Sequence, residues 1–320
     1  MNKRYLSGIQ PNGDLHLGNY FGAIRKHIEA QDNAFYFLAN YHALNTIHDA
    51  ATLDRLTTEA AATYLALGLD PDRATLFRQS DVPEVCELAW LLATATGKGL
   101  LDRAHSYKDK VNRGLPASMG LFFYPVLMAA DILACDTDVV PVGSDQVQHV
   151  EMCRDMATLF NNQYGREVFK LPVYELGAPV PVPGIDGLKM SKSHDNTIPI
   201  FAPAKQLKAR VMLIKTDGTP LEAPKDPDTC NVMALYKLVA SPEEVAILEV
   251  KYRNGGYGHG HAKLDLLAAL EERFGAARER YNALMQDRAS VDKALAHGAL
   301  RARAVAGQVT DRAREATGLR

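Results

Sequence analysis

The chain has few of the features that mark secreted or membrane proteins. It contains only four cysteines, scattered at Cys86, Cys135, Cys153 and Cys230. Because no Cys-x-x-Cys pair occurs, the pattern argues against a zinc knuckle or redox motif and favours reduced thiols. No apolar run is long enough to cross a bilayer, and the N-terminus has no apolar signal core. We therefore expect a cytoplasmic protein that does not contact a membrane.

Neither sign of charge is in large excess. A formal net charge of −2 argues against a non-specific polyanion binder, although local basic patches remain compatible with one structured RNA. Hydrophobic residues make up 47% and charged residues 23%, which is typical of a globular protein. A length of 320 residues fits one catalytic domain of the size usual for nucleotide-binding folds, together with a smaller second domain.

Strand and helix signals alternate along the first half of the chain. Strands are predicted at 4–9, 34–39, 74–78 and 138–142. Segments with helical periodicity follow these strands, the first at 18–28. This alternation is typical of a parallel sheet with crossover helices. The expected fold class is therefore α/β.

Two further regions read as mainly helical. The segment at about 82–134 is interpreted as a helical insertion. Beyond residue 194, Ser241 and Glu244 form a predicted capping box, and an amphipathic repeat runs over 262–285. We expect a catalytic domain over 1–193 and a helical domain over 194–320.

The first candidate motif runs from Gly8 to Asn19, where a strand is predicted to pass into a helix. Helix N-terminal amides attract phosphate, and Gly18 would let a nucleotide approach the backbone. His16 and Asn19 offer donors to phosphate oxygens. Taken alone, the segment is better explained as an ordinary helix start that carries a surface histidine, because short motifs have many false positives.

The second candidate motif is Lys189 to Ser193, on a loop that follows Gly184 and Gly187. Two lysines on such a loop can close over a phosphate chain and neutralise a departing pyrophosphate. The alternative is a solvated basic loop. The two motifs occurring together, with a strand and helix scaffold between them, favour nucleotide chemistry.

These two segments resemble the HIGH-type and KMSKS signatures of class I aminoacyl-tRNA synthetases. Residues 128–132 and 141–149 look like the tryptophanyl-tRNA synthetase family, and residues 195–199 are similar to one branch of it. The resemblance implies a Rossmann-like catalytic domain and a helical domain that recognises the anticodon. It also allows the C-terminal helix to pack back on the catalytic domain, and it implies a homodimer whose interface includes the insertion and the single tryptophan, Trp90.

The resemblance also assigns residues to ATP, which would carry Mg²⁺ on its phosphates. The implied catalytic residues are His16, Lys189, Lys192 and Ser193. The implied ATP-binding residues also include Gln10, Pro11, Asn12, Gly18, Asn19, Lys110, Gly143, Ser144, Asp145, Val182, Met190 and Ser191. Lys110 is equally compatible with an exposed surface lysine. No protein metal site is expected.

An indole offers one N–H donor on an apolar ring, so its pocket needs one acceptor and apolar walls. Asp131 matches the family's acceptor, and its apolar neighbours argue against a surface position. Phenylalanine, which lacks the donor, should be rejected by several orders of magnitude. The remaining implied tryptophan-binding residues are Leu6, Gly8, His42, Tyr124, Met128, Val140, Val142 and Gln146.

By resemblance, the reaction joins L-tryptophan to AMP, releases pyrophosphate and then charges tRNA(Trp). Three alternatives remain open: a tyrosine-specific synthetase, a small-molecule nucleotidylyltransferase, and a non-catalytic synthetase-like RNA-binding protein. Lys237, Arg301 and Arg303 are candidate tRNA contacts, although each is also compatible with a solvated helix face.

Overall fold

A computed structural model describes residues 3–104, 107, 118–177 and 180–319. Its centre is a five-stranded sheet in the order β3-β2-β1-β4-β5, and every strand pair is parallel. The strands are β1 (Tyr5–Ile9), β2 (Ala34–Leu38), β3 (Thr75–Arg78), β4 (Val139–Val142) and β5 (Val173–Leu176). This confirms the predicted α/β class with a Rossmann-like parallel sheet.

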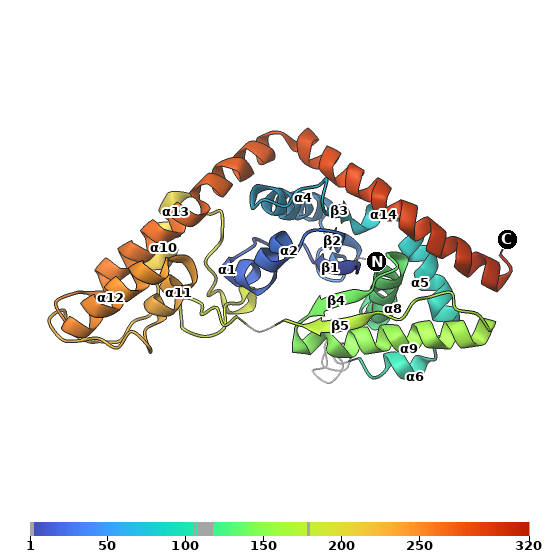
Figure 1. The fold of residues 1–320 in the computed structure, drawn as a ribbon, viewed down its shortest axis with the longest axis horizontal. Coiled ribbons are helices and arrows are strands. Elements are labelled where there is room, and N and C mark those ends of the chain that lie inside the picture. Colours follow the sequence, from blue (N-terminus) through green and yellow to red (C-terminus); the bar gives the residue numbers. More distant parts are fainter. Residues whose placement is uncertain (1–2, 105–106, 108–117, 178–179, 320) are drawn as a thin grey trace.

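Helices cover the sheet and continue beyond it (Figure 1). Those before and within the sheet region are α1 (Leu17–Asn19), α2 (Arg25–Glu29), α3 (Asn40–Ala43), α4 (Ala50–Ala66), α5 (Glu84–Ala95), α6 (Lys98–Leu101), α8 (Met119–Ala134) and α9 (Val147–Tyr164). Those of the C-terminal region are α10 (Ala204–Met212), α11 (Asn231–Val239), α12 (Pro242–Asn254), α13 (His259–Gln286) and α14 (Arg288–Thr317). Single turns are η1 (Tyr20–Ile24), η2 (Gln79–Asp81), η3 (Ser144–Gln146) and η4 (Lys192–His194).

The two faces of the sheet bury two separate apolar clusters. In β2, Tyr36 and Leu38 pack into the cluster that also holds α4, α11 and α13. Phe35 and Phe37 point to the opposite face and join the cluster with α5, α8, α9 and α14. Because successive side chains of a strand alternate between faces, β2 anchors both layers. Of the C-terminal helices, α11 and α13 thus share a core with one face of the sheet, and α14 contributes to the core on the other face.

Two local predictions differ from the structure. The single helix predicted over 18–28 is interrupted by the π-helical turn η1, a feature often found near functional sites. The strand β5 was not predicted, since all four of its residues are exposed at the sheet edge and show no buried pattern. The capping box predicted at Ser241 and Glu244 is confirmed at the start of α12.

The last helix returns across the sheet. In Figure 1, α13 and α14 meet at an angle above α4, and α14 (red) runs down beside α5. α14 also packs on β3, where a Cβ on Gly298 would lie 1.8 Å from the carbonyl oxygen of Leu76. Only glycine permits this close approach of helix backbone to strand backbone.

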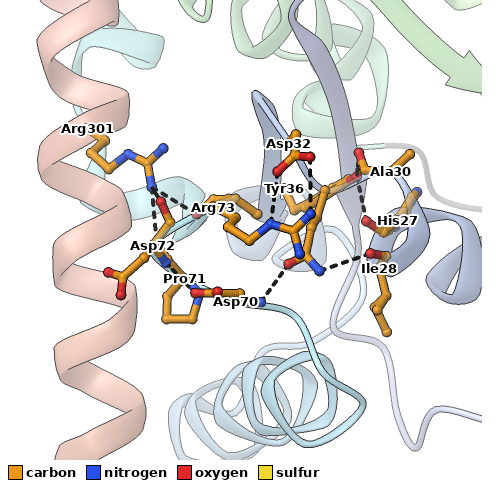
Figure 2. A network of polar contacts seen from close by, with 12 residues as sticks. His27, Ile28, Ala30, Asp32, Tyr36, Asp70, Pro71, Asp72, Arg73 and Arg301 are labelled. Carbon is orange, nitrogen blue, oxygen red and sulfur yellow. Dashed lines mark hydrogen bonds and ion pairs between the residues drawn. The ribbon is translucent and has the colours of Figure 1, made fainter.

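A polar network secures the amino end of the sheet, the edge at which β2 and β3 begin. Arg301 of α14 donates to the backbone carbonyls of Pro71 and Ala74, at 3.0 and 3.1 Å, and Figure 2 shows Arg301 beside Pro71. Arg73 pairs with Asp32 in the same network. These contacts hold α14 at the amino ends of the strands, so the carboxyl ends remain available for a functional site.

Candidate functional site

The carboxyl ends of four neighbouring strands supply the candidate site. β1 leads into the loop at 10–16, β2 into α3, β3 into η2, and β4 into η3. β1 lies between β2 and β4, so the direction of strand order reverses there. Ligands of open α/β sheets bind in the crevice at such a switch point.

The two predicted motifs lie side by side in space. His16 forms an isolated antiparallel bridge with Pro199, and the amide of Leu17 donates to the carbonyl of Ile198 at 3.0 Å. The segment directly after the lysine loop is therefore joined by backbone hydrogen bonds to the loop that opens the first helix. These bonds hold the lysine loop next to the opening loop, and so they limit the positions that the side chains of Lys189 and Lys192 can reach.

Lys192 extends from its loop to the opening turn. Its Nζ donates to Asn12 Oδ1 at 2.9 Å and to the Gly13 carbonyl at 2.8 Å. Gly13 has a φ of 120°, a conformation that glycine adopts without strain. Burial lowers the pKa of the Lys192 ammonium, and attraction to Asp14 opposes this. The structure thus places a cation on the turn predicted to hold phosphates.

His16 is buried, with 6% of its surface exposed. Its Nδ1 has no hydrogen-bond partner within the described part of the chain. Burial, and secondly repulsion from Lys192, lowers the pKa of His16 to about 4. At neutral pH the ring is therefore uncharged and can donate only one N–H.

Gly18 belongs to the first motif and lies against Met190 of the second. A Cβ there would be 2.9 Å from the His16 ring and 3.4 Å from Met190 Cβ. The Gly18 amide donates to the Met190 sulfur at 3.3 Å. Thioether sulfur is a weak acceptor. A phosphate oxygen is a stronger one and can therefore replace the Met190 sulfur as the acceptor for the Gly18 N–H.

Asn196 organises the lysine loop, and its role was not predicted. It is 1% exposed. Its Oδ1 accepts from the Ser191 amide at 2.7 Å, and its Nδ2 donates to the Lys189 carbonyl at 3.1 Å and to Asp186 Oδ1 at 2.8 Å. Gly184 permits this arrangement, since a Cβ there would lie 2.4 Å from the Asn196 side chain.

The other predicted ATP-binding residues lie in the loop after β4, in the lysine loop and in the opening loop. Gly143, Ser144 and Asp145 are exposed directly after β4. The Val182 carbonyl accepts from the Met190 amide at 2.9 Å, while Lys189 and Ser193 are exposed. In the opening loop, the Gln10 carbonyl accepts from the Asn12 amide, Pro11 is buried, and Asn19 Oδ1 accepts from the His16 amide. Lys110 lies outside the described residues.

Asp131 on α8 is buried, with 3% of its surface exposed. His42 Nε2 contacts its Oδ2 at 3.0 Å. Gln79 Nε2 donates to Oδ1 and to Oδ2, at 2.8 Å each. Burial raises the pKa of the Asp131 carboxyl, and the contacts with His42 and Gln79 oppose that rise. A buried carboxyl group is thus held by residues that follow the carboxyl ends of β2 and β3.

The predicted pocket walls belong to one apolar cluster, which also includes residues of α8 next to Asp131 in the sequence. Leu6 and Val140 are buried in the same apolar cluster, and Met128 and Val142 pack against it. A Cβ on Gly8 would lie 2.5 Å from the Phe37 ring.

The polar residues of the pocket have partners of their own. Tyr124 forms a short hydrogen bond with His149 Nε2, a partner that was not predicted, and its ring meets that of His42 edge to face. Gln146 donates to Asp145 at 2.9 Å. The local sequence around His149 and Gln79 does not show whether they are site residues or ordinary buried polar residues.

The candidate tRNA contacts already have intramolecular partners. Arg301 binds backbone carbonyls before β3, Arg303 pairs with Glu84 at 3.0 Å, and Lys237 pairs with Glu249 at 2.9 Å. Each of the three side chains is thus engaged within the fold. Within the described ranges, no helix is long and apolar enough to span a membrane, and no three His, Cys, Asp or Glu side chains are grouped for a metal ion.

Comparison with known proteins gives consistent matches. The family model of tRNA synthetases class I (W and Y) matches residues 2–275. The tryptophan–tRNA ligase of Rhodopirellula baltica is 51% identical over 322 residues, covering 99% of this chain and 100% of the relative. That of Fusobacterium nucleatum is 51% identical, covering 99% and 98%. The structure of tryptophanyl-tRNA synthetase from Campylobacter jejuni complexed with ADP and tryptophan superposes with a TM-score of 0.95 at 47% identity, covering 98% of this chain and 99% of that one.

Proposed function

The chain belongs to the class I tRNA synthetases of the tryptophan and tyrosine group, and we propose that it activates L-tryptophan with ATP and charges tRNA(Trp). The observation that supports the choice of amino acid is the buried Asp131 carboxyl, which contacts His42 and Gln79 beyond the carboxyl ends of β2 and β3. Full-length relatives at 51% identity are tryptophan–tRNA ligases, which supports the same substrate here.

ATP binds across the two motifs in this proposal. The Gly18 amide and the neutral His16 ring donate to phosphate oxygens, while Lys192 and Lys189 supply positive charge from the opposite loop. Mg²⁺ arrives with the phosphates and neutralises part of their charge. The ATP ribose and adenine lie near Gly143 to Asp145 and Val182.

The tryptophan carboxylate attacks the α-phosphorus in line, the bond to the bridging oxygen breaks, and pyrophosphate leaves. The terminal ribose hydroxyl of the tRNA then takes the acyl group and AMP departs. No side chain forms a bond to substrate, so positioning and charge stabilisation carry the rate. Lys192 serves both purposes, because it already contacts the turn on which the phosphates are proposed to lie.

Tryptophan is selected by its single N–H donor. Asp131 accepts that N–H, while Leu6, Met128 and Val140 contact the apolar ring. Phenylalanine fills the same space but leaves the carboxylate without its donor, and desolvating an unsatisfied charged group is costly. Tyrosine offers a hydroxyl donor, but its single ring is smaller than the indole bicycle.

The remaining parts of the molecule serve RNA binding and assembly. The catalytic domain spans 1–193 with the insertion at about 82–134, and the helical region over 194–320 recognises the anticodon of tRNA(Trp). Two copies form a dimer through the insertion. Trp90 and Met119 support this interface, since they are 68% and 73% exposed in the single chain and large exposed apolar groups favour protein contacts. The protein acts in the cytoplasm, where its tRNA is charged.

A charging assay tests the proposal. The purified protein is incubated with ATP, tRNA and radiolabelled tryptophan or tyrosine, and acid-precipitable label is counted. Label from tryptophan alone is expected. Charging with tyrosine at an equal or greater rate would establish the tyrosine alternative, and tRNA binding without charging by either amino acid would establish the non-catalytic alternative.

A further inference from the structure

Gln79 is fully buried at the first position of η2, directly after β3. Both ends of its amide are engaged. The Oε1 atom accepts from the Tyr41 backbone N–H at 2.9 Å, and Nε2 donates to both oxygens of Asp131 at 2.8 Å. Because a backbone N–H can only donate, the oxygen must face Tyr41 and the nitrogen must face Asp131.

The segments that carry this bridge are locked to each other. Asn40 Nδ2 donates to Ser80 Oγ at 2.7 Å, and the Ser80 amide donates back to Asn40 Oδ1 at 3.0 Å. These reciprocal bonds join α3 to η2 at the ends of the paired strands β2 and β3. Gln79 is therefore presented to Asp131 from a rigid support.

Gln79 limits what Asp131 can accept. An ionised carboxylate offers about four acceptor positions. The two contacts from Gln79 and one from His42 at 3.0 Å leave roughly one position open, on the Oδ1 side. We propose that Gln79 is a positioning residue that orients Asp131 so that its open acceptor position receives a single N–H donor of the substrate. This inference rests on the proposed tryptophan activity.

The test combines a variant with a substrate analogue. Gln79→Met keeps the side-chain volume but removes the donor to Asp131. L-3-benzothienylalanine has the shape of tryptophan with sulfur in place of the N–H. Exchange of labelled pyrophosphate into ATP gives the KM of each amino acid, and the KM of the analogue divided by that of tryptophan measures how strongly the N–H is recognised.

Gln79→Met is expected to raise the KM of tryptophan about tenfold, since a charge-assisted contact is lost, and to leave that of the analogue unchanged. The KM ratio should thus fall about tenfold. An equal rise in both values would show that Gln79 only maintains the pocket, and would overturn the proposal. Gln79→Asn is one methylene too short to bridge Tyr41 and Asp131, so it provides a milder second variant, and an unchanged ratio there would likewise overturn it.

Gln31, which precedes β2 at the amino end of the sheet, supplies a matched control. It is also buried, donates to the Ile28 carbonyl at 3.0 Å and accepts from the Asp70 amide at 2.7 Å. Gln31→Met removes an equivalent amide bridge and should leave the ratio of the analogue KM to the tryptophan KM unchanged. A fall equal to that of Gln79→Met would overturn the proposal.

Absence of tryptophan-dependent exchange in the wild type would refute the proposed function itself, whereas an active wild type with an unchanged KM ratio in Gln79→Met would refute only this inference.

Discussion

Lys192 Nζ lies 2.9 Å from Asn12 Oδ1, although the two residues are 180 positions apart in the chain. The contact brings a cation from the second motif onto the turn of the first. Because the groups that would stabilise phosphate charge are already assembled, little reorganisation is needed when ATP binds. The fold between them, from β2 to β5, serves to place these two loops together.

Removing that cation should slow chemistry more than it weakens amino acid binding. Lys192→Ala is expected to lower kcat of pyrophosphate exchange by about 10²–10³ with little change in the KM of tryptophan. The exposed Lys208 on α10 provides a control, and Lys208→Ala should leave both values near wild type. A proportionate loss in kcat and tryptophan affinity would contradict the role given to Lys192.

The lysine loop should lose its shape when Asn196 is replaced. Asn196→Ala removes three hydrogen bonds that tie Ser191, Lys189 and Asp186 together, and the KM of ATP should rise about tenfold. Asn161 on α9 also makes three hydrogen bonds to backbone, remote from the motifs. Asn161→Ala should reduce stability without changing the KM of ATP, and steady-state kinetics of both variants distinguish loop ordering from general loss of stability.

The crossing of α14 over β3 predicts opposite effects of alanine at two glycines of one helix. At Gly298 a Cβ would lie 1.8 Å from the Leu76 carbonyl oxygen, whereas at Gly307 nothing lies within 4 Å. Gly298→Ala should lower the free energy of unfolding by about 1–3 kcal/mol or more. Gly307→Ala should raise it by about 0.5–1 kcal/mol, because alanine favours helix. Urea denaturation measures both, and equal effects would contradict the close packing.

Much of the sheet could be predicted because strands such as β2 and β3 are largely buried. The apolar run at 34–39 corresponds to β2, whose five residues are all buried between two layers. By contrast, β5 lies at the edge with all of its residues exposed, so its sequence carries no such signal. Arg301 was considered as an RNA contact because sequence does not reveal the carbonyls of Pro71 and Ala74 that it binds.

The candidate site could be predicted in part. The residues of both motifs lie within short segments, so their patterns are visible in the sequence. Gln79 and His149 act on residues that the fold brings close from distant parts of the chain, whereas Asn196 acts within its own loop. Nothing in the local sequence distinguishes the three from other polar residues. Gln79 and Asp131 are 52 positions apart, and only the shared edge of the sheet brings them together.

Buried histidine predicts how stability depends on pH. Burial lowers the pKa of His27 from 6.5 to about 4, while its Nδ1 contacts the Tyr64 hydroxyl at 2.9 Å. Between these pH values the unfolded chain binds a proton that the folded chain does not, so stability falls as pH is lowered. The slope should be about 1.4 kcal/mol per pH unit for this group.

His27→Gln should remove that contribution while retaining a partner for Tyr64. Urea denaturation at several pH values between 6.5 and 4 gives the slope for each protein. Identical slopes in wild type and variant would show that His27 titrates normally in the fold.

In the proposed mechanism the two motifs activate an amino acid that Asp131 selects. Exchange of labelled pyrophosphate into ATP, measured with each standard amino acid in turn, reports both activation and selection. Exchange is expected with tryptophan, and the rate with phenylalanine should be lower by several orders of magnitude. Exchange supported equally by tyrosine, or by no amino acid, would contradict this mechanism.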